Sequence, residues 1–70
     1  MPMIMVEGPP VSSVDVKRRL VEGLTEVAAE VYEMDRAIIH VVVRENPPEN
    51  VGSGGRLIAD IHAARGRDGG

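Results

Sequence analysis

The chain has 70 residues and a net charge of −3 at pH 7, with both signs of charge interspersed, so it lacks the basic face that nucleic-acid binding requires. It contains no cysteine and no histidine–carboxylate cluster with the spacing of a structural metal site, which excludes disulfide and metal stabilisation. No apolar stretch has the length of a membrane span and no signal-peptide pattern is present, so we expect a cytoplasmic protein without membrane, nucleic-acid or metal partners.

The first element is a short apolar strand over residues 3–7, which Gly8-Pro9-Pro10 ends because proline donates no hydrogen bond to a sheet. A helix is expected to begin at Ser12 or Ser13 and to end between Tyr32 and Met34. Ser12 is the preferred N-cap, since Asp15 follows at capping-box spacing. The apolar positions recur every three or four residues and trace one helix face, at Val16, Leu20, Leu24, Val27, Ala28 and Val31.

Residues 37–44 predict the second strand, because they form a nearly continuous run of β-branched residues. Strand, helix and strand make a βαβ unit with parallel strands. Alternation places Ile39, Val41 and Val43 on one face of the sheet. It places His40 and Arg44 on the other face, which also carries apolar residues. The helix covers one face only, so a neighbouring subunit is expected to cover the second.

The remainder of the chain predicts a loop, a tight turn and a short arm. Residues 46–50 are a loop by composition, and Gly52-Ser53-Gly54-Gly55 is a turn that needs positive φ rather than a phosphate loop. Residues 56–64 are expected to form a hairpin arm or a partner-docking segment, and residues 65–70 a disordered tail. The expected domain spans residues 1–64. The fold class is α/β (α+β): one β-α-β unit with a short C-terminal hairpin arm, assembled into an oligomer.

Oligomerisation is also expected from the composition of the core. The chain has no Trp, no Phe and one tyrosine, Tyr32. A single core in a chain this short rarely supplies more than about 3–5 kcal/mol. With no disulfide or metal to help, self-association is the remaining usual source of stability.

Pro2, directly behind the initiator methionine, is the candidate catalytic residue. Removal of Met1 would leave a secondary amine at the chain end. An α-amino group titrates near about 7.7–8.0, so such an amine can accept a proton in one step and return it in the next. A Met-Pro start also occurs without any function, and the residues of this segment alone leave both readings open.

The joint spacing of three features resembles the 4-oxalocrotonate tautomerase family, in particular its DmpI-like small tautomerases. These features are Pro2, a βαβ unit of this length and a Gly-x-Gly-Gly turn after the second strand. Residues 24–32 and 45–60 are especially similar, and the likeness covers about residues 2 to 62. It implies that Pro2 is the general base of an enol–keto tautomerisation that needs no cofactor. It also implies a dimer building block and a homohexamer, and a setting such as aromatic compound degradation.

The resemblance further implies two arginines and an aromatic wall around the substrate, and this sequence departs from all three. The corresponding positions hold Ser12, His40 and Val51. Arg44, on the strand face of His40, is the candidate replacement for a carboxylate clamp, or else an exposed strand end. His40 is either a substrate hydrogen-bond partner or a buried contact histidine, and Val51 either an apolar wall of the site or simple packing.

Other residues carry weaker expectations. Arg56 is more simply a surface residue than a contributor to a neighbour's pocket, and Arg18, Arg19 and His62 are expected to be solvated or contact residues.

Two further functions stay open. Pro2 could act as an acid in decarboxylation or dehalogenation, with Glu7 or Glu45 as the water-activating carboxylate, or the chain could be a catalytically weak oligomeric scaffold.

Overall fold

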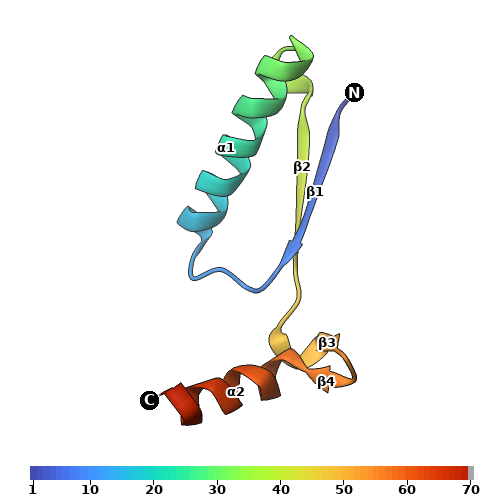
Figure 1. Ribbon diagram of the computed structural model, residues 1–70. Coiled ribbons are helices and arrows are strands. Elements are labelled where there is room, and N and C mark those ends of the chain that lie inside the picture. Colours follow the sequence, from blue (N-terminus) through green and yellow to red (C-terminus); the bar gives the residue numbers. More distant parts are fainter. Residues whose placement is uncertain (70) are drawn as a thin grey trace.

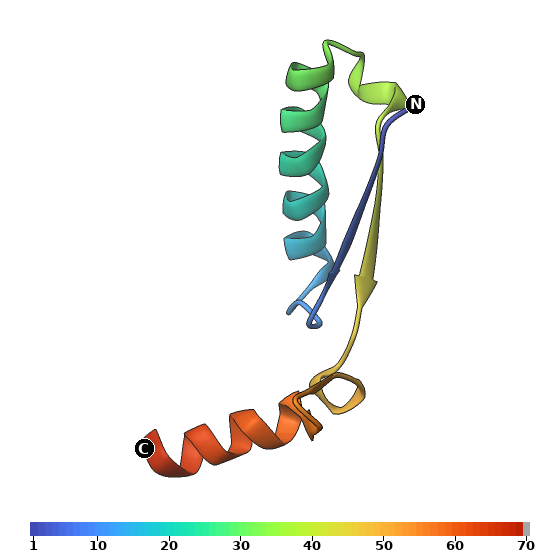
Figure 2. The ribbon, with the colours of Figure 1, turned by 45° about the vertical axis from the view of Figure 1, so that its right-hand side comes forward.

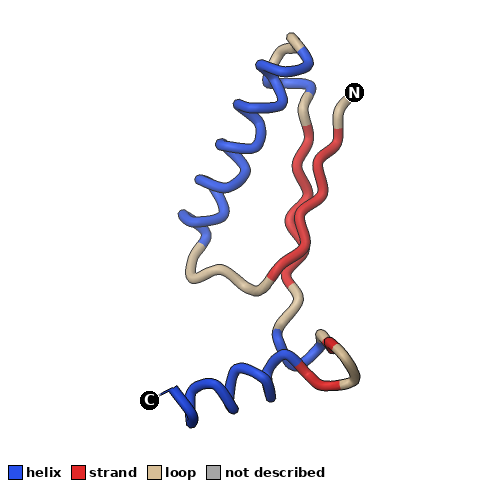
Figure 3. Tube along the Cα trace, in the orientation of Figure 1, coloured by secondary structure: helices blue, strands red, loops and turns tan. Residues whose placement is uncertain are grey.

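The computed structural model describes residues 1–69 (Figure 1). Its β-α-β unit consists of β1 (Met3–Gly8), α1 (Val14–Tyr32) and β2 (His40–Glu45), with the short 3-10 turn η1 (Arg36–Ile38) before β2. A second 3-10 turn, η2 (Pro48–Asn50), leads into the strands β3 (Gly52–Ser53) and β4 (Arg56–Leu57) and the helix α2 (Ile58–Gly69). Figure 3 shows the two parts of the chain as a long upper unit and a lower arm. The expected fold class is confirmed.

The strands β1 and β2 are parallel and in register from Met3 opposite His40 to Gly8 opposite Glu45. Exposure alternates along both strands, and α1 packs over β2 on the less exposed face. The predicted alternation is therefore confirmed. The open face carries Met3 and Met5, which are 59% and 55% exposed. Both are large apolar side chains that this chain leaves uncovered.

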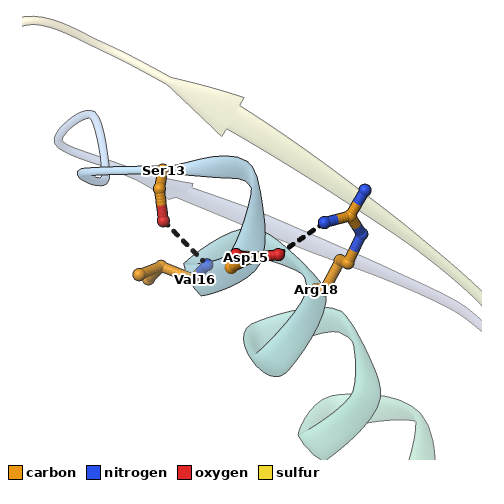
Figure 4. A network of polar contacts seen from close by, with 4 residues as sticks. All are labelled: Ser13, Asp15, Val16 and Arg18. Carbon is orange, nitrogen blue, oxygen red and sulfur yellow. Dashed lines mark hydrogen bonds and ion pairs between the residues drawn. The ribbon is translucent and has the colours of Figure 1, made fainter.

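The helix α1 is capped by Ser13, not by Ser12 as the sequence predicts. Ser13 has extended backbone angles, and its hydroxyl accepts a hydrogen bond from the Val16 N–H at 3.3 Å (Figure 4). Asp15 pairs with Arg18 instead of completing a capping box. Val16 therefore occupies the third helical position, and the capping role falls one residue later than predicted.

The helix ends at Tyr32, within the predicted range, and Glu33 follows in a left-handed conformation with φ 53°. The second strand begins later than predicted, at His40 rather than residue 37. The Asp35 carboxylate accepts the Ala37 N–H at 2.9 Å and holds residues 36–38 in the turn η1. This local hydrogen bond outweighs the strand propensity of the isoleucines that follow.

The C-terminal arm turns at the predicted Gly-x-Gly-Gly sequence, where Gly54 and Gly55 have φ of 60° and 85°. The helix α2 then runs to Gly69, whereas the sequence predicts disorder from residue 65. The division of the chain at residue 64 stays a prediction, and residue 70 lies outside the described part of the chain.

The arm points away from the β-α-β unit (Figure 2). The radius of gyration is 16.3 Å and the molecule measures 48 × 24 × 18 Å, whereas a compact chain of this length has a radius of about 11 Å. Among residues 1–66, whose side chains are described, only Ala28 and Ile39 are buried hydrophobics. One copy of the chain therefore has a very small core.

Candidate functional site

Pro2 lies where the two strands of the parallel sheet begin. It is half-buried, and its carbonyl oxygen accepts the backbone N–H of His40 at 3.1 Å. This hydrogen bond fixes the chain end beside the start of β2. The His40 side chain lies on the open face of the sheet, opposite Met3 in the register. The parallel pairing thus brings together two of the predicted site residues.

Arg44 lies at the other end of the same face. It is four residues beyond His40, which corresponds to about 13 Å along a strand. Its register partner is Glu7, and within the described part of the chain Arg44 makes no ion pair. Arg44 is exposed, and no carboxylate among the described residues occupies its guanidinium, but it lies far from Pro2 of the same chain.

Val51 lies farther still, in a groove of about 490 Å³ between the strand ends and the arm. The groove is lined by Glu7, Gly8, Pro9, Asn46, Pro48, Val51, Ile58 and His62. One copy of the chain does not bring the predicted site residues to one place: Pro2 and His40 are at one end of the sheet, and Arg44 and Val51 at the other.

Polar groups of the groove are held by hydrogen bonds from neighbouring chain segments. The Asn46 side chain donates from Nδ2 to Glu7 Oε1 at 3.2 Å. The backbone N–H of Asn46 donates to the Gly8 carbonyl at 2.8 Å. The sequence analysis assigns no role to Asn46 and expects His62 to be a solvated or contact residue. Only the path of the arm brings His62 to the same groove as the end of β1.

Glu45, one of the two candidate carboxylates, is engaged elsewhere. Its Oε1 lies 2.8 Å from the Lys17 ammonium, and its Oε2 accepts the Val11 N–H at 2.8 Å. The hydrogen bond from Lys17, followed by that from Val11, lowers the pKa of Glu45 below its usual value. Glu45 therefore ties the start of α1 and the preceding loop to β2. That loop carries Ser12, which is exposed.

A second groove runs along the outer side of α1 and is lined by three cations, Lys17, Arg18 and Arg36. Each of them pairs with a carboxylate, respectively that of Glu45, Asp15 and Glu26. These pairs leave no free cation among the three to define an anion site. The groove containing Val51 is the better candidate because it also holds Glu7, Asn46 and His62.

Two general features of the described residues bear on the possible chemistry. Within residues 1–69, no helix is long and apolar enough to cross a membrane. In the same part of the chain, no three His, Cys, Asp or Glu side chains are grouped to hold a metal ion.

Comparison with known proteins finds a matching family and similar solved structures. Residues 2–61 match the model of the tautomerase enzyme family. The solved structure of DmpI from Archaeoglobus fulgidus is 54% identical, covering 84% of this chain and 100% of that one, with a TM-score of 0.76. No curated protein matches significantly.

Two further solved structures share the fold. TomN, a 4-oxalocrotonate tautomerase homologue in the tomaymycin biosynthetic pathway, is 34% identical over 89% of this chain and 95% of that one, with a TM-score of 0.82. A heterohexamer 4-oxalocrotonate tautomerase from Chloroflexus aurantiacus is 23% identical over 87% of this chain and 98% of that one, with a TM-score of 0.78. The chain belongs to the tautomerase family.

Proposed function

We propose that the protein is a cofactor-independent tautomerase in which Pro2, exposed by removal of Met1, is the general base. Its substrate is a 2-hydroxydienoate-like or other enol carboxylate, which undergoes a 1,3- or 1,5-proton transfer. The observation that carries this proposal is the match to the tautomerase family, which begins at residue 2. Pro2 is the first residue of the matched region, which supports the proposed role of its amine.

The proposed reaction is a proton shuttle with no net loss of atoms. The neutral Pro2 amine takes the hydroxyl proton of the enol, and the oxygen lone pair becomes a carbonyl as electron density moves along the diene. The resulting ammonium then delivers the proton to a carbon, which regenerates the amine. This cycle needs an amine with a pKa near the working pH, which an α-amino group provides at about 7.7–8.0.

We further propose that the working form is a homo-oligomer, built from dimers and reaching a homohexamer. The small core, the exposed Met3 and Met5 and the extended arm support association. The Chloroflexus aurantiacus protein of the same fold is a heterohexamer. Association also supports catalysis, since Arg44 and Val51 can approach a Pro2 only if it comes from another copy. A cytoplasmic location and a part in aromatic compound degradation stay predictions.

The proposal is tested by following ketonisation of phenylenolpyruvate and 2-hydroxymuconate, after intact-mass analysis has shown whether Met1 is absent. We expect turnover that is lost in the Pro2→Ala variant. Labelling of the N-terminus by a proline-directed electrophile provides an independent measure of a free amine. Retention of Met1 in the native protein, or full activity of Pro2→Ala, would refute Pro2 as the base.

One observation keeps a second reaction in view. Glu7 lines the groove, whereas Glu45 is held by Lys17 and Val11. If Pro2 acts as an acid in decarboxylation or dehalogenation, Glu7 is therefore the better candidate for the water-activating carboxylate. Release of carbon dioxide or halide that requires both Pro2 and Glu7 would favour this reaction over tautomerisation.

A further inference from the structure

We propose that Arg65 of α2 binds the carboxylate of the substrate, and that Glu7, at the other end of the groove, disfavours a substrate with a second carboxylate. This rests on the proposed function, in which the substrate is an enol carboxylate. It assigns a binding role to a residue in the segment for which the sequence predicts disorder. It also narrows the substrate class to enol monocarboxylates.

The groove that contains Val51 has room for such a substrate, but no lysine or arginine is among the described residues that line it. Its volume of about 490 Å³ falls within the range of about 300–1,000 Å³ that is common for small-molecule sites. Its polar side chains are those of Glu7, Asn46 and His62. A carboxylate leaves water at a high cost unless an opposite charge or hydrogen bonds receive it. The cation must therefore come from the edge of the groove.

Arg65 lies at that edge because of its position on α2. Ile58 and His62, about one turn apart, both line the groove. Arg65 follows Ile58 by close to two full turns, so it continues the same helix face beyond His62. Long side chains on a helix lean toward its N-terminus, which directs the Arg65 side chain back over the turn that carries His62. The helix begins beneath the strand ends and runs outward (Figure 1), which puts this cation at the outer end of the groove.

The charge of Arg65 is free to meet a ligand. The residue is exposed, and no ion pair joins it to another side chain that the structure describes. The cations Lys17, Arg18 and Arg36 each pair with a carboxylate, and Arg44 lies on the open face of the sheet. A guanidinium presents two parallel N–H groups to a carboxylate, so Arg65 can hold the substrate in one orientation.

The position of Arg65 also makes it a distinguishing feature of this chain. The match to the tautomerase family ends at residue 61, four residues before Arg65. The structure of DmpI from Archaeoglobus fulgidus is matched along 100% of its own length by only 84% of this chain. A binding residue outside the matched region would give this chain a substrate preference of its own.

The charge at the other end of the groove orients the substrate. Glu7 lies near the end of β1, and its Oε1 accepts a hydrogen bond from Asn46 Nδ2 at 3.2 Å, which holds the carboxylate in place. The carboxylate of a bound substrate is attracted by Arg65 and repelled by Glu7. A second carboxylate at the far end of the substrate would face Glu7, and the like charges would weaken binding. One cation and one anion therefore favour an enol with a single carboxylate.

Kinetics with a charged and an uncharged substrate test the role of Arg65. We expect Arg65→Gln to lower kcat/KM for phenylenolpyruvate about ten- to hundredfold, mainly through a higher KM, as the loss of a contact with a charged group would. The methyl ester of phenylenolpyruvate lacks the charge and should be converted equally well by Arg65→Gln and the wild type. Arg65→Lys keeps the charge without the fork and should recover part of the loss. Arg56→Gln, on the same arm, is the matched control and should behave as the wild type.

Glu7→Gln tests the selection against a second carboxylate. It removes the charge, whereas its amide oxygen still accepts the Asn46 N–H. We expect the ratio of kcat/KM for 2-hydroxymuconate to that for phenylenolpyruvate to rise about fivefold, as the relief of one like-charge contact near water would. An unchanged ratio would show that Glu7 does not face the substrate.

Three outcomes would overturn the role of Arg65: unchanged kinetics in Arg65→Gln, equal losses for the acid and its ester, or a charge-dependent loss confined to Arg44→Gln. Each of them leaves the role of Pro2 intact as long as Pro2→Ala is inactive. An active Pro2→Ala variant would instead refute the proposed function itself. Circular dichroism and sedimentation equilibrium establish that each variant is folded and assembled like the wild type.

Discussion

Gly23→Ala is a substitution whose effect should change sign between one copy of the chain and the assembled protein. Gly23 lies in the middle of α1, and a Cβ built there meets no heavy atom within 4 Å in this chain. Replacing an interior helical glycine with alanine is worth about 0.8–1.0 kcal/mol of helix propensity. The isolated chain should therefore gain about that much stability, because nothing in it obstructs the methyl group.

An interface along α1 would reverse this result. Gly23 lies on the same helical stripe as Leu20, Val27 and Val31, and the last two residues are 62% and 72% exposed. This line of residues is an apolar stripe that one copy leaves uncovered. If another α1 packs against it at Gly23, the added methyl overpacks the contact and costs about 1–3 kcal/mol. Dissociation constants should then rise by about 5-fold to 160-fold.

Sedimentation equilibrium gives the dissociation constant, and urea unfolding at several protein concentrations separates dissociation from unfolding of the chain. Glu22→Ala is the matched control, because Glu22 lies outside this stripe and both glutamate and alanine are good helix formers. We expect Gly23→Ala to weaken assembly and Glu22→Ala to leave it unchanged. Tighter or unaltered association of Gly23→Ala would show that this stripe does not form a close contact between copies.

Three further predictions concern local structure. Glu33→Gly should stabilise the protein by about 0.4–1 kcal/mol in urea unfolding, since Glu33 occupies the left-handed region with φ 53°; a loss of stability would contradict this. Ser13→Ala should cost about 1 kcal/mol and Ser12→Ala close to nothing, because only Ser13 accepts the Val16 N–H; equal costs would return the cap to Ser12. The lowered pKa of Glu45 means that its stabilisation is present above its unfolded value of 4.5 and is lost as pH falls through the lower folded value. In Glu45→Gln this part of the acid dependence should disappear, and an unchanged pH profile would exclude the linkage.

The β-α-β unit could be predicted from the sequence because its signals are local and periodic. The β-branched run around Val41–Val43 predicts a strand, the three- and four-residue spacing of α1 predicts its length, and simple alternation predicts which strand residues share a face. The errors are local too. The hydrogen bond from Ala37 to Asp35 delays β2, and the cap falls at Ser13, because side-chain contacts of this kind do not alter the hydrophobic pattern.

The candidate site could be predicted only in part, for a different reason. Pro2 and His40 are neighbours because the strands are parallel, and that follows from the β-α-β order of the elements. The meeting of Glu7, Asn46 and His62 depends on the direction in which α2 leaves the glycine turn. Positive φ at Gly54 and Gly55 sets that direction. The spacing of apolar residues in the sequence gives no information about it. The groove was therefore beyond prediction, although all of its residues could be read in the sequence.

The very small core of one copy and the separation of its predicted site residues have the same structural cause. The arm leaves the β-α-β unit instead of covering it, so Met3 and Met5 remain exposed and the core reduces to Ala28 and Ile39 among the described side chains. The same departure carries Val51 and His62 away from Pro2. Contacts between copies would bury the exposed faces and bring an amine to the groove in one event. Folding, assembly and activity should consequently depend on protein concentration together, because a single set of contacts supplies all three.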